Sequence, residues 1–322
     1  MNYVPLTIAD VRAAAGRIAP FVRRTPVITD EQLNELLGAE VYFKCENLQR
    51  GGSFKLRGAS NAVRSLADDV AARGVATHSS GNHGAALALA ARLRGTPAYV
   101  VMPENSAAVK IEAVRQCGAE IVFCKPGRIA REAALERLLS ERSLEVVHPY
   151  DDDRVICGQG TAALELLEAQ PKLDVVMAPV GGGGLISGTA IAVKGVKPDI
   201  EVIGVEPAQA DDAYRSFHSG ERVLLDAPET IADGLRASLG VRNFAIIRRQ
   251  VDNIVRVTEG GIVQSVRLVL QRLKLLIEPS AAVAVAALVE RRMEIKGRRI
   301  GVILSGGNID LGAATWLTGD ER

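Results

Sequence analysis

Short apolar runs alternate along this chain with longer segments in which apolar residues recur every three or four positions. The first pattern predicts buried strands, and the second predicts helices that bury one face. Between residues 74 and 151 the two patterns alternate without interruption. Strands are predicted there at 74–78, 98–102, 120–124 and 145–147, and helices at 85–93, 107–116 and 130–140. This order is typical of βαβ units, whose parallel strands form a sheet with covered faces.

The remainder of the chain shows the same alternation at wider spacing, apart from an irregular span at 207–228. Helices are predicted over 7–20, 30–37, 163–169, 185–193 and 261–275, a further helix begins near residue 55, and strands are predicted at 41–44, 175–180, 201–205 and 300–304. The order of elements predicts the α/β class with two lobes, one of them formed by the segment near 74–151.

The composition narrows the range of partners. Of the 322 residues, 48% are hydrophobic and 24% are charged, which is ordinary for a globular protein. Thirty-nine basic and 38 acidic residues leave a net charge of +1, so no charge surplus points to nucleic acid or to an anionic membrane. We therefore expect a small-molecule partner. Only 4% of the residues are aromatic, so the core must be mainly aliphatic.

No basic-then-apolar leader is present at the N-terminus, and no apolar run is long enough to span a bilayer. We expect a soluble, cytoplasmic protein. The cysteines at 45, 117, 124 and 157 have neither CxxC spacing nor neighbouring histidine pairs, so we expect buried thiols rather than a zinc site or disulfides.

Lys55 stands in the stretch Ser53-Phe54-Lys55-Leu56-Arg57-Gly58, where a predicted helix begins. Most lysines are solvated surface charges. If Lys55 is desolvated at a helix start, however, burial and the positive end of the helix dipole both favour the neutral amine. That form is the nucleophile needed for a Schiff base with an aldehyde, so Lys55 is a candidate for covalent catalysis.

Four successive glycines, Gly181, Gly182, Gly183 and Gly184, separate a predicted strand from a predicted helix. Backbone amides can approach an anion closely at such a junction, and the helix dipole adds to the attraction. A plain flexible turn or a dinucleotide loop are the alternatives. The glycines lack the spaced GxGxxG pattern and no P-loop lysine follows, so a single phosphate is the better ligand.

Two more polar stretches follow predicted strands, at 79–83 and at 305–308. The first holds two serines, an asparagine and a histidine, and could receive a carboxylate through its hydroxyls and the free N–H groups of a helix start. An ordinary capped turn explains it equally well. The second stretch, Ser305-Gly306-Gly307-Asn308, is either a simple turn or part of a ligand site, since ligands gather at strand ends in open α/β sheets.

These motifs occur in one order along nearly the whole chain and together resemble the serine racemase and threonine/serine dehydratase family. The motifs are Ser-Phe-Lys with Arg-Gly at 53–58, THSSGNHG at 77–84, PVGGGG at 179–184, IADG at 231–234, LLIEP at 275–279 and LSGGN at 304–308. The resemblance is strongest to the serine racemase branch, through Glu206-Pro207 before Ala210-Asp211-Asp212 and through Pro228-Glu229-Thr230.

Members of this family depend on pyridoxal phosphate and have the type II fold, which is similar to that of the tryptophan synthase beta chain. The resemblance therefore implies two open, twisted, mostly parallel sheets flanked by helices. It also implies a large cofactor-binding domain of residues 1–73 and 152–322, a small mobile domain of residues 74–151, and a homodimer.

The resemblance assigns the cofactor residues one by one. Lys55 would hold the cofactor as a Schiff base, Phe54 would pack beside it, and Asn82 would bond its 3′ oxygen. The phosphate would be held by Gly181, Gly182, Gly183, Gly184 and Leu185. Ser305 would meet the pyridine nitrogen, where a hydroxyl can donate to an unprotonated ring and so favours elimination over chemistry that needs a stronger electron sink.

The resemblance also implies a substrate site. The substrate carboxylate would be received by Ser79, Ser80, Asn82 and His83, and further substrate-side positions are Arg131, Tyr150, Gly234 and Glu278. Serine racemases use a serine at the position of Ser80 as the acid/base on the cofactor face opposite the lysine. Its presence permits racemisation without proving it, since relatives that mainly dehydrate also have serine there.

A divalent cation is implied at Glu206, the backbone carbonyl of Ala210, and Asp212. Oxygen ligands of this kind suit Mg²⁺ or Ca²⁺ rather than zinc. The alternative is an acidic surface loop.

Departures from the family pattern leave the substrate side chain open. Serine racemase has asparagine, glutamine and serine where this chain has Tyr150, Ala85 and Ala237, and Gly51 replaces a threonine before the lysine motif. The main hypothesis is a dehydratase that converts L-serine, L-threonine or 3-hydroxyaspartate to a 2-oxo acid and ammonia. Racemisation through Lys55 and Ser80 is the alternative. A non-catalytic ligand sensor and a nicotinamide-dependent oxidoreductase are disfavoured.

Overall fold

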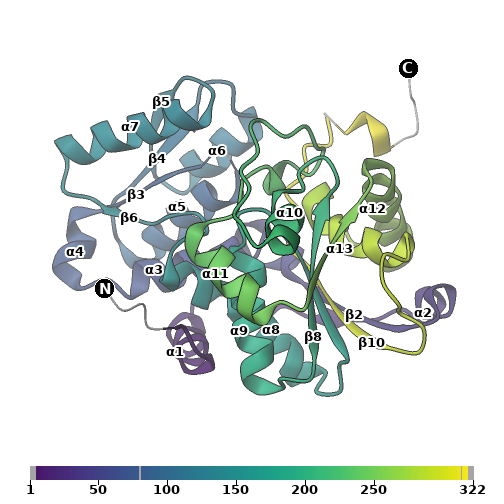
Figure 1. The fold of residues 1–322 in the computed structure, drawn as a ribbon. Coiled ribbons are helices and arrows are strands. Elements are labelled where there is room, and N and C mark those ends of the chain that lie inside the picture. Colours follow the sequence, from purple (N-terminus) through teal and green to yellow (C-terminus); the bar gives the residue numbers. More distant parts are fainter. Residues whose placement is uncertain (1–4, 80, 313, 318–322) are drawn as a thin grey trace.

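The computed structural model describes residues 5–79, 81–312 and 314–317, and within them the strands form two sheets flanked by helices (Figure 1). All strand pairs are parallel except the short edge pair β1–β2. The predicted fold class, α/β with two mostly parallel sheets, is confirmed. Among the described residues, no helix is both long enough and apolar enough to cross a bilayer.

The smaller sheet has the strand order β5-β4-β3-β6. Its strands are β3 (Val75–His78), β4 (Ala98–Pro103), β5 (Glu120–Cys124) and β6 (Glu145–Val146), and its helices are α5 (Asn82–Arg94), α6 (Ala108–Gln116) and α7 (Arg128–Glu141). Successive residues of β4 point to opposite faces of the sheet. Val100 packs with Ala88 of α5 and Val114 of α6, and Val101 packs with Leu135 of α7. We call this sheet with its three helices the small lobe.

The larger sheet has the order β1-β2-β10-β7-β8-β9. Its strands are β1 (Val27–Ile28), β2 (Glu40–Cys45), β7 (Val175–Pro179), β8 (Glu201–Pro207), β9 (Asn253–Val257) and β10 (Arg299–Leu304). The remaining helices are α1 (Ile8–Ile18), α2 (Glu31–Leu37), α3 (Lys55–Arg64), α4 (Asp68–Arg73), α8 (Asp153–Ala169), α9 (Gly184–Val196), α10 (Asp212–Ser219), α11 (Val241–Gln250), α12 (Glu259–Leu273) and α13 (Pro279–Val289). This sheet and the helices on its faces form the large lobe.

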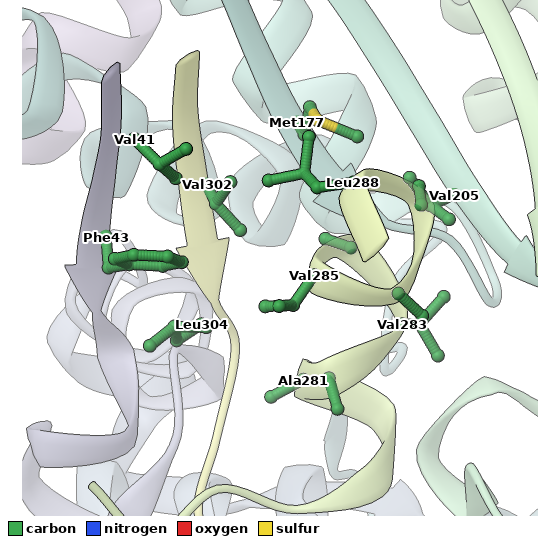
Figure 2. Packing of buried hydrophobic residues seen from close by; sticks show 14 of the residues in the cluster. Val41, Phe43, Met177, Val205, Ala281, Val283, Val285, Leu288, Val302 and Leu304 are labelled. Carbon is green, nitrogen blue, oxygen red and sulfur yellow. The ribbon is translucent and has the colours of Figure 1, made fainter. Parts of the chain in front are cut away.

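Helix α13 lies at the centre of the core on one face of the large sheet. Its Val283, Val285 and Leu288 lie among side chains from β2, β10, β7 and β8, including Phe43 and Met177 (Figure 2). The apolar residues of α13 are buried on every side, so the helix has no polar face. Helix α13 was not predicted, because a helix that is apolar all round lacks the 3.6-residue period of apolar positions.

Other differences from the predicted elements are local. Helix α8 begins at Asp153, ten residues before the predicted start, and α10 lies inside the span predicted to be irregular. Helix α11 and edge strand β9 were also missed. Cys45, Cys124 and Cys157 are buried as predicted, whereas Cys117 is partly exposed.

Helix α3 joins the two lobes and begins with Lys55, the residue predicted to act as a nucleophile. Its apolar face packs with both α5 and α8 in one cluster that includes Leu56, Leu87 and Val155. Its polar anchor is Arg57, whose guanidinium is fully buried and lies 2.7 Å from both Glu46 and Glu165. Lys44 also pairs with Glu165, at 2.6 Å. The first turn of α3 is therefore tied to the residue that follows β2 and to α8.

Candidate active site

A pocket opens at the carboxyl ends of β7 and β10 and is closed on one side by the small lobe. It brings together every residue that the sequence analysis assigned to the cofactor. Its lining consists of Phe54, Lys55, Asn82, Tyr150, Pro179, Gly181, Gly182, Gly183, Gly184, Leu185, Gly234, Leu235, Glu278, Ser280 and Ser305. Ligand sites of open α/β sheets lie at such carboxyl ends.

Lys55 is the first residue of α3, as predicted. Its amine donates a hydrogen bond to the carbonyl of Pro149 at 3.0 Å and lies 5.1 Å from the centre of the Phe54 ring. Burial lowers the pKa of Lys55 to about 8, although the carboxyl of Glu278 acts in the opposite direction. About a tenth of the amine is therefore neutral, and so nucleophilic, at pH 7, far more than for an ordinary lysine.

The backbone around Lys55 is aligned by the end of strand β10. The N–H of Phe54 donates to the carbonyl of Ser305 at 3.0 Å, and Ser53 forms an antiparallel bridge with Gly306. These contacts place Lys55 and Ser305 in one pocket although 250 residues separate them in the sequence.

The glycine loop lies between β7 and α9, which begins at Gly184. Gly183 has φ +93°, a conformation that favours glycine. A Cβ at Gly182 would lie 2.3 Å from the Tyr150 ring, so the loop needs glycine there to admit the aromatic ring. The first N–H groups of a helix have no partner within it, and the loop presents those of α9 to the pocket. This arrangement suits a single phosphate.

Asn243 of α11 is a residue of this site that the sequence analysis missed. It is fully buried, and its Nδ2 donates at 2.9 Å both to the carbonyl of Gly182 and to that of Tyr150. Asp151 accepts from the N–H groups of Val241 and Arg242 at the start of the same helix. The glycine loop and the segment that returns from the small lobe are thus held to one helix. A single asparagine within an amphipathic helix carries no sequence signal for this role.

Asn82 and Glu278 meet inside the pocket. Nδ2 of Asn82 donates to the Glu278 carboxyl at 2.9 Å, and Nδ2 of Asn308 donates to Oδ1 of Asn82 at 3.0 Å. Glu278 is only 4% exposed. Burial raises its pKa to about 7, with the charge of Asp233 adding to the shift and the Asn82 hydrogen bond opposing it. The carboxyl is therefore poised between its two protonation states near neutral pH.

Of the described residues predicted to receive the substrate carboxylate, Asn82 lines the pocket. Ser79 is buried and its Oγ accepts from the N–H of Gly81 at 3.2 Å, but neither Ser79 nor His83 lines the pocket. His83 is buried, and its Nε2 lies 3.2 Å from the carbonyl of Val147. Burial lowers the pKa of His83 well below its ordinary value, so the ring is neutral. Ser80 lies outside the described residues.

Next to Tyr150 lies a group of rings that the sequence analysis did not single out. The His148 ring contacts the rings of Tyr150 and His78 edge-on, with centres 4.6 and 5.7 Å apart. Burial lowers the pKa of both histidines, that of His78 to about 4. Arg131 of α7 does not line the pocket, but its charge lowers the pKa of His78 and acts on that of Tyr150. The positive charge of Arg131, a residue of the small lobe, therefore lies near His78 and Tyr150.

A family model for pyridoxal-phosphate dependent enzymes matches residues 18–306. The chain belongs to this family. β-Hydroxyaspartate dehydratase of Paracoccus denitrificans (strain Pd 1222) is 46% identical over 314 residues, which cover 98% of this chain and 99% of that protein.

Solved structures agree with the family. Maize serine racemase superposes with a TM-score of 0.94 at 42% identity, covering 96% of this chain and 95% of that one. A threonine deaminase from T.th. superposes with a TM-score of 0.90 at 42% identity, covering 95% of this chain and 99% of that one. The predicted family, the type II fold and the dependence on pyridoxal phosphate are confirmed, and dehydratase or racemase activity is supported for this chain.

The pocket of this pyridoxal phosphate-dependent enzyme fits its cofactor in chemistry as well as in position. The glycine loop offers backbone donors to a phosphate, and Lys55 offers an amine with a lowered pKa to an aldehyde. Ser305 is buried at the end of β10, where its hydroxyl can serve a neutral ring nitrogen.

The residues of the expected cation site are buried in the large lobe. Glu206, Ala210 and Asp212 are each at most 1% exposed, so an acidic surface loop is the wrong description. Glu206 accepts from the N–H groups of Ala213 and Tyr214, and Asp212 accepts from that of Leu239. Burial and mutual repulsion raise the pKa of Glu206, and burial raises that of Asp212 to about 6. Within the described part of the chain, no group of three or more His, Cys, Asp or Glu side chains has a metal-binding arrangement.

Proposed function

We propose that this enzyme is a dehydratase that converts a hydroxy amino acid to a 2-oxo acid and ammonia, with L-serine, L-threonine and 3-hydroxyaspartate as the candidate substrates. The observation that carries the proposal is the position of the Lys55 amine, which has a lowered pKa and faces a pocket with a glycine loop at one side and Ser305 at another. Relatives named as a β-hydroxyaspartate dehydratase and a threonine deaminase support it.

Each end of the cofactor has residues to hold it. The N–H groups of Gly181–Gly184 and Leu185 would bind the phosphate, Phe54 would pack beside the ring, and Ser305 and Asn82 would bond its polar atoms. All of these residues line the pocket. When bound, pyridoxal phosphate supplies an aldehyde that combines with amino groups and a ring that withdraws electrons from the substrate α-carbon.

Lys55 is the proton acceptor at the substrate α-carbon. The Cα proton passes to Lys55, the Cβ–O bond breaks, and the leaving hydroxide takes up one proton, so that the net loss is one water. Hydrolysis of the released unsaturated amine gives the 2-oxo acid and ammonia. By resemblance to the family, the substrate carboxylate would be received by Ser79, Ser80, Asn82 and His83, of which Asn82 lines the pocket. Tyr150, Gly234 and Glu278, which line the pocket, would surround the rest of the substrate, and Arg131, which lies outside the lining, would act on it through its charge.

Racemisation is the second candidate function, because the chain has Ser80 at the position where serine racemases use a serine as the acid/base opposite the lysine. The similarity to maize serine racemase supports it. Loss of a proton to one residue and gain of a proton from the other inverts the α-carbon without loss of water.

One assay distinguishes the two functions. The holoenzyme is incubated with L-serine, L-threonine and the isomers of 3-hydroxyaspartate, and both 2-oxo acid and the chirality of the recovered amino acid are measured. We expect oxo acid from at least one substrate and none from Lys55→Ala. Absence of oxo acid from every substrate would refute the dehydratase. Racemisation that survives Ser80→Ala would remove Ser80 from the second function.

We also propose that Glu206, Asp212 and the carbonyl of Ala210 bind Mg²⁺ or Ca²⁺. Burial raises the pKa of both carboxyls, a bound cation would supply the positive charge that buried carboxylates need, and oxygen ligands suit these ions. Calorimetric titration of chelator-treated enzyme with Ca²⁺ and Mg²⁺ tests this proposal. Asp212→Asn should abolish the binding heat.

Three further proposals come from the family resemblance. The small domain of residues 74–151 moves against the large domain of residues 1–73 and 152–322, the enzyme forms a homodimer, and it works in the cytoplasm. Sedimentation analysis tests the dimer, and hydrogen exchange with and without substrate tests the movement. Fractionation of the native cell tests the location.

A further inference from the structure

An ion pair between the two lobes lies beside the pocket. Lys110 of α6 in the small lobe pairs with Asp233, the first residue of the 3₁₀ helix η3 (Asp233–Leu235) in the large lobe. The side chains are 26% and 40% exposed, so the pair lies at the surface rather than in the core.

Helix η3 forms part of the wall of the pocket. Gly234 and Leu235 line it, and the N–H of Gly234 donates to Oγ of Ser280, another lining residue, at 3.0 Å. A Cβ at Gly181 would lie 2.9 Å from Cα of Leu235, so η3 also presses against the glycine loop. A displacement of Asp233 would therefore move Gly234 and Leu235 in the pocket wall and, through Leu235, the glycine loop at Gly181.

The electrostatics place the pair within reach of the pocket interior. The charge of Asp233 raises the pKa of Glu278 and the charge of Lys110 lowers it. Removal of either charge would leave the other one unbalanced near a site that must accept a carboxylate substrate. The pair thus affects the pocket in two ways: it sets the position of η3, and it changes the electrostatic potential near Glu278.

We propose that Lys110 and Asp233 are positioning residues whose ion pair holds the small lobe against η3 when the pocket closes on its substrate. This inference rests on the proposed dehydratase function and on the proposed movement of the small domain. Exposed pairs contribute little to global stability, so this contact can form and break in each catalytic cycle without unfolding either lobe. Salt weakens it, because exposed charges are screened.

The kinetic test uses charge removal and charge reversal in the holoenzyme. Lys110→Met and Asp233→Asn should each raise KM for the best hydroxy amino acid about fivefold or more, with kcat changed less and pyridoxal phosphate content unchanged. The double reversal Lys110→Asp with Asp233→Lys should restore KM to within about threefold of the starting enzyme. Lys125→Met is the matched control, because Lys125 forms an exposed pair with Glu104 inside the small lobe, and it should leave KM unchanged.

Two kinetic outcomes would overturn the proposal. Single variants with unchanged KM would show that the pair does not affect the pocket. A double reversal as poor as the single variants would show that the two residues act separately. Raised salt should increase KM in the starting enzyme and leave it unaltered in Lys110→Met, and equal salt effects in both would contradict the ion-pair mechanism.

Hydrogen exchange provides a readout that does not require turnover. Asp233→Asn should speed amide exchange in α6, which lies in the other lobe, and Lys110→Met should speed exchange in η3. Exchange unchanged across the lobes would refute the contact itself. If no hydroxy amino acid is dehydrated but exchange changes as expected, the dehydratase proposal fails while the interlobe contact stands.

Discussion

The Asn82 amide nitrogen lies 2.9 Å from one carboxyl oxygen of Glu278 and 3.1 Å from the other, so a residue of the small lobe and a residue of the large lobe share a hydrogen bond inside the pocket. Asn308 holds the amide oxygen of the same asparagine at 3.0 Å. The orientation of Asn82 is therefore set by two large-lobe residues that follow it by more than 190 positions in the chain.

Glu278→Gln should stabilise the cofactor-free enzyme at pH 8 and have much less effect at pH 5. The folded-state pKa of about 7 exceeds the ordinary value of about 4.5, so the unfolded chain releases this proton first as pH rises. Stability contributed by the protonated group is present below pH 4.5 and is lost progressively up to pH 7. The gain on removing the carboxyl is up to about 3 kcal/mol at pH 8. Thermal unfolding at both pH values measures it, and an equal gain at the two would contradict the assignment.

Uptake of pyridoxal phosphate by the cofactor-free enzyme should accelerate with pH and level off above about pH 8. Only the neutral amine of Lys55 reacts with an aldehyde, and its pKa is about 8. Between pH 6 and pH 8 the neutral fraction rises roughly 50-fold. Stopped-flow absorbance follows the reaction, and Lys55→Ala should show no visible band. A rate independent of pH over this range would show that the amine is not the limiting group.

Gly182→Ala should weaken binding of pyridoxal phosphate at least tenfold while the fold is retained. The added Cβ would lie 2.3 Å from the Tyr150 ring, so either the ring or the loop must move. Gly16→Ala in α1 is the matched control, since nothing lies within 4 Å of its added Cβ. The control should bind the cofactor normally and be as stable as the starting enzyme or more so. Equilibrium dialysis gives the affinities, and equal affinities for the two variants would contradict the packing argument.

Arg57→Met should destabilise the enzyme by about 3–5 kcal/mol, because it leaves the buried carboxylate of Glu46 without its ion-pair partner and leaves Glu165 with Lys44 alone. Arg24→Met provides the comparison, since the Arg24–Glu168 pair is exposed and its loss should cost about 1 kcal/mol or less. Denaturant unfolding measures both. Similar losses in the two variants would show that burial of the Arg57 network does not set its contribution.

Much of the fold could be predicted because many elements carry a regular pattern. The alternation in 74–151 predicted every strand of the small lobe, and the junctions at Lys55 and Gly181–Gly184 were placed correctly at helix starts. Helix α13 was missed because it is apolar on all sides, and β9 was missed because a five-residue edge strand gives too short a pattern.

The cofactor residues were predicted from motifs, whereas their supporting contacts were not. The Asn243 side chain holds the glycine loop from a helix that is distant in the sequence, and no local spacing of residues predicts this contact. Lys110 and Asp233 are 123 positions apart and look like ordinary surface charges in the sequence.

By itself, the sequence determined that a lysine begins a helix and that a glycine loop suited to phosphate lies between a strand and a helix, because backbone conformation depends mainly on nearby residues. Only the tertiary structure decided that Lys55 is desolvated, that Glu278 keeps a proton to about pH 7, and that Lys110 reaches Asp233. Desolvation and charge interaction depend on which atoms exclude water and on the distances between charges. In this protein both are set by segments brought together from opposite ends of the chain.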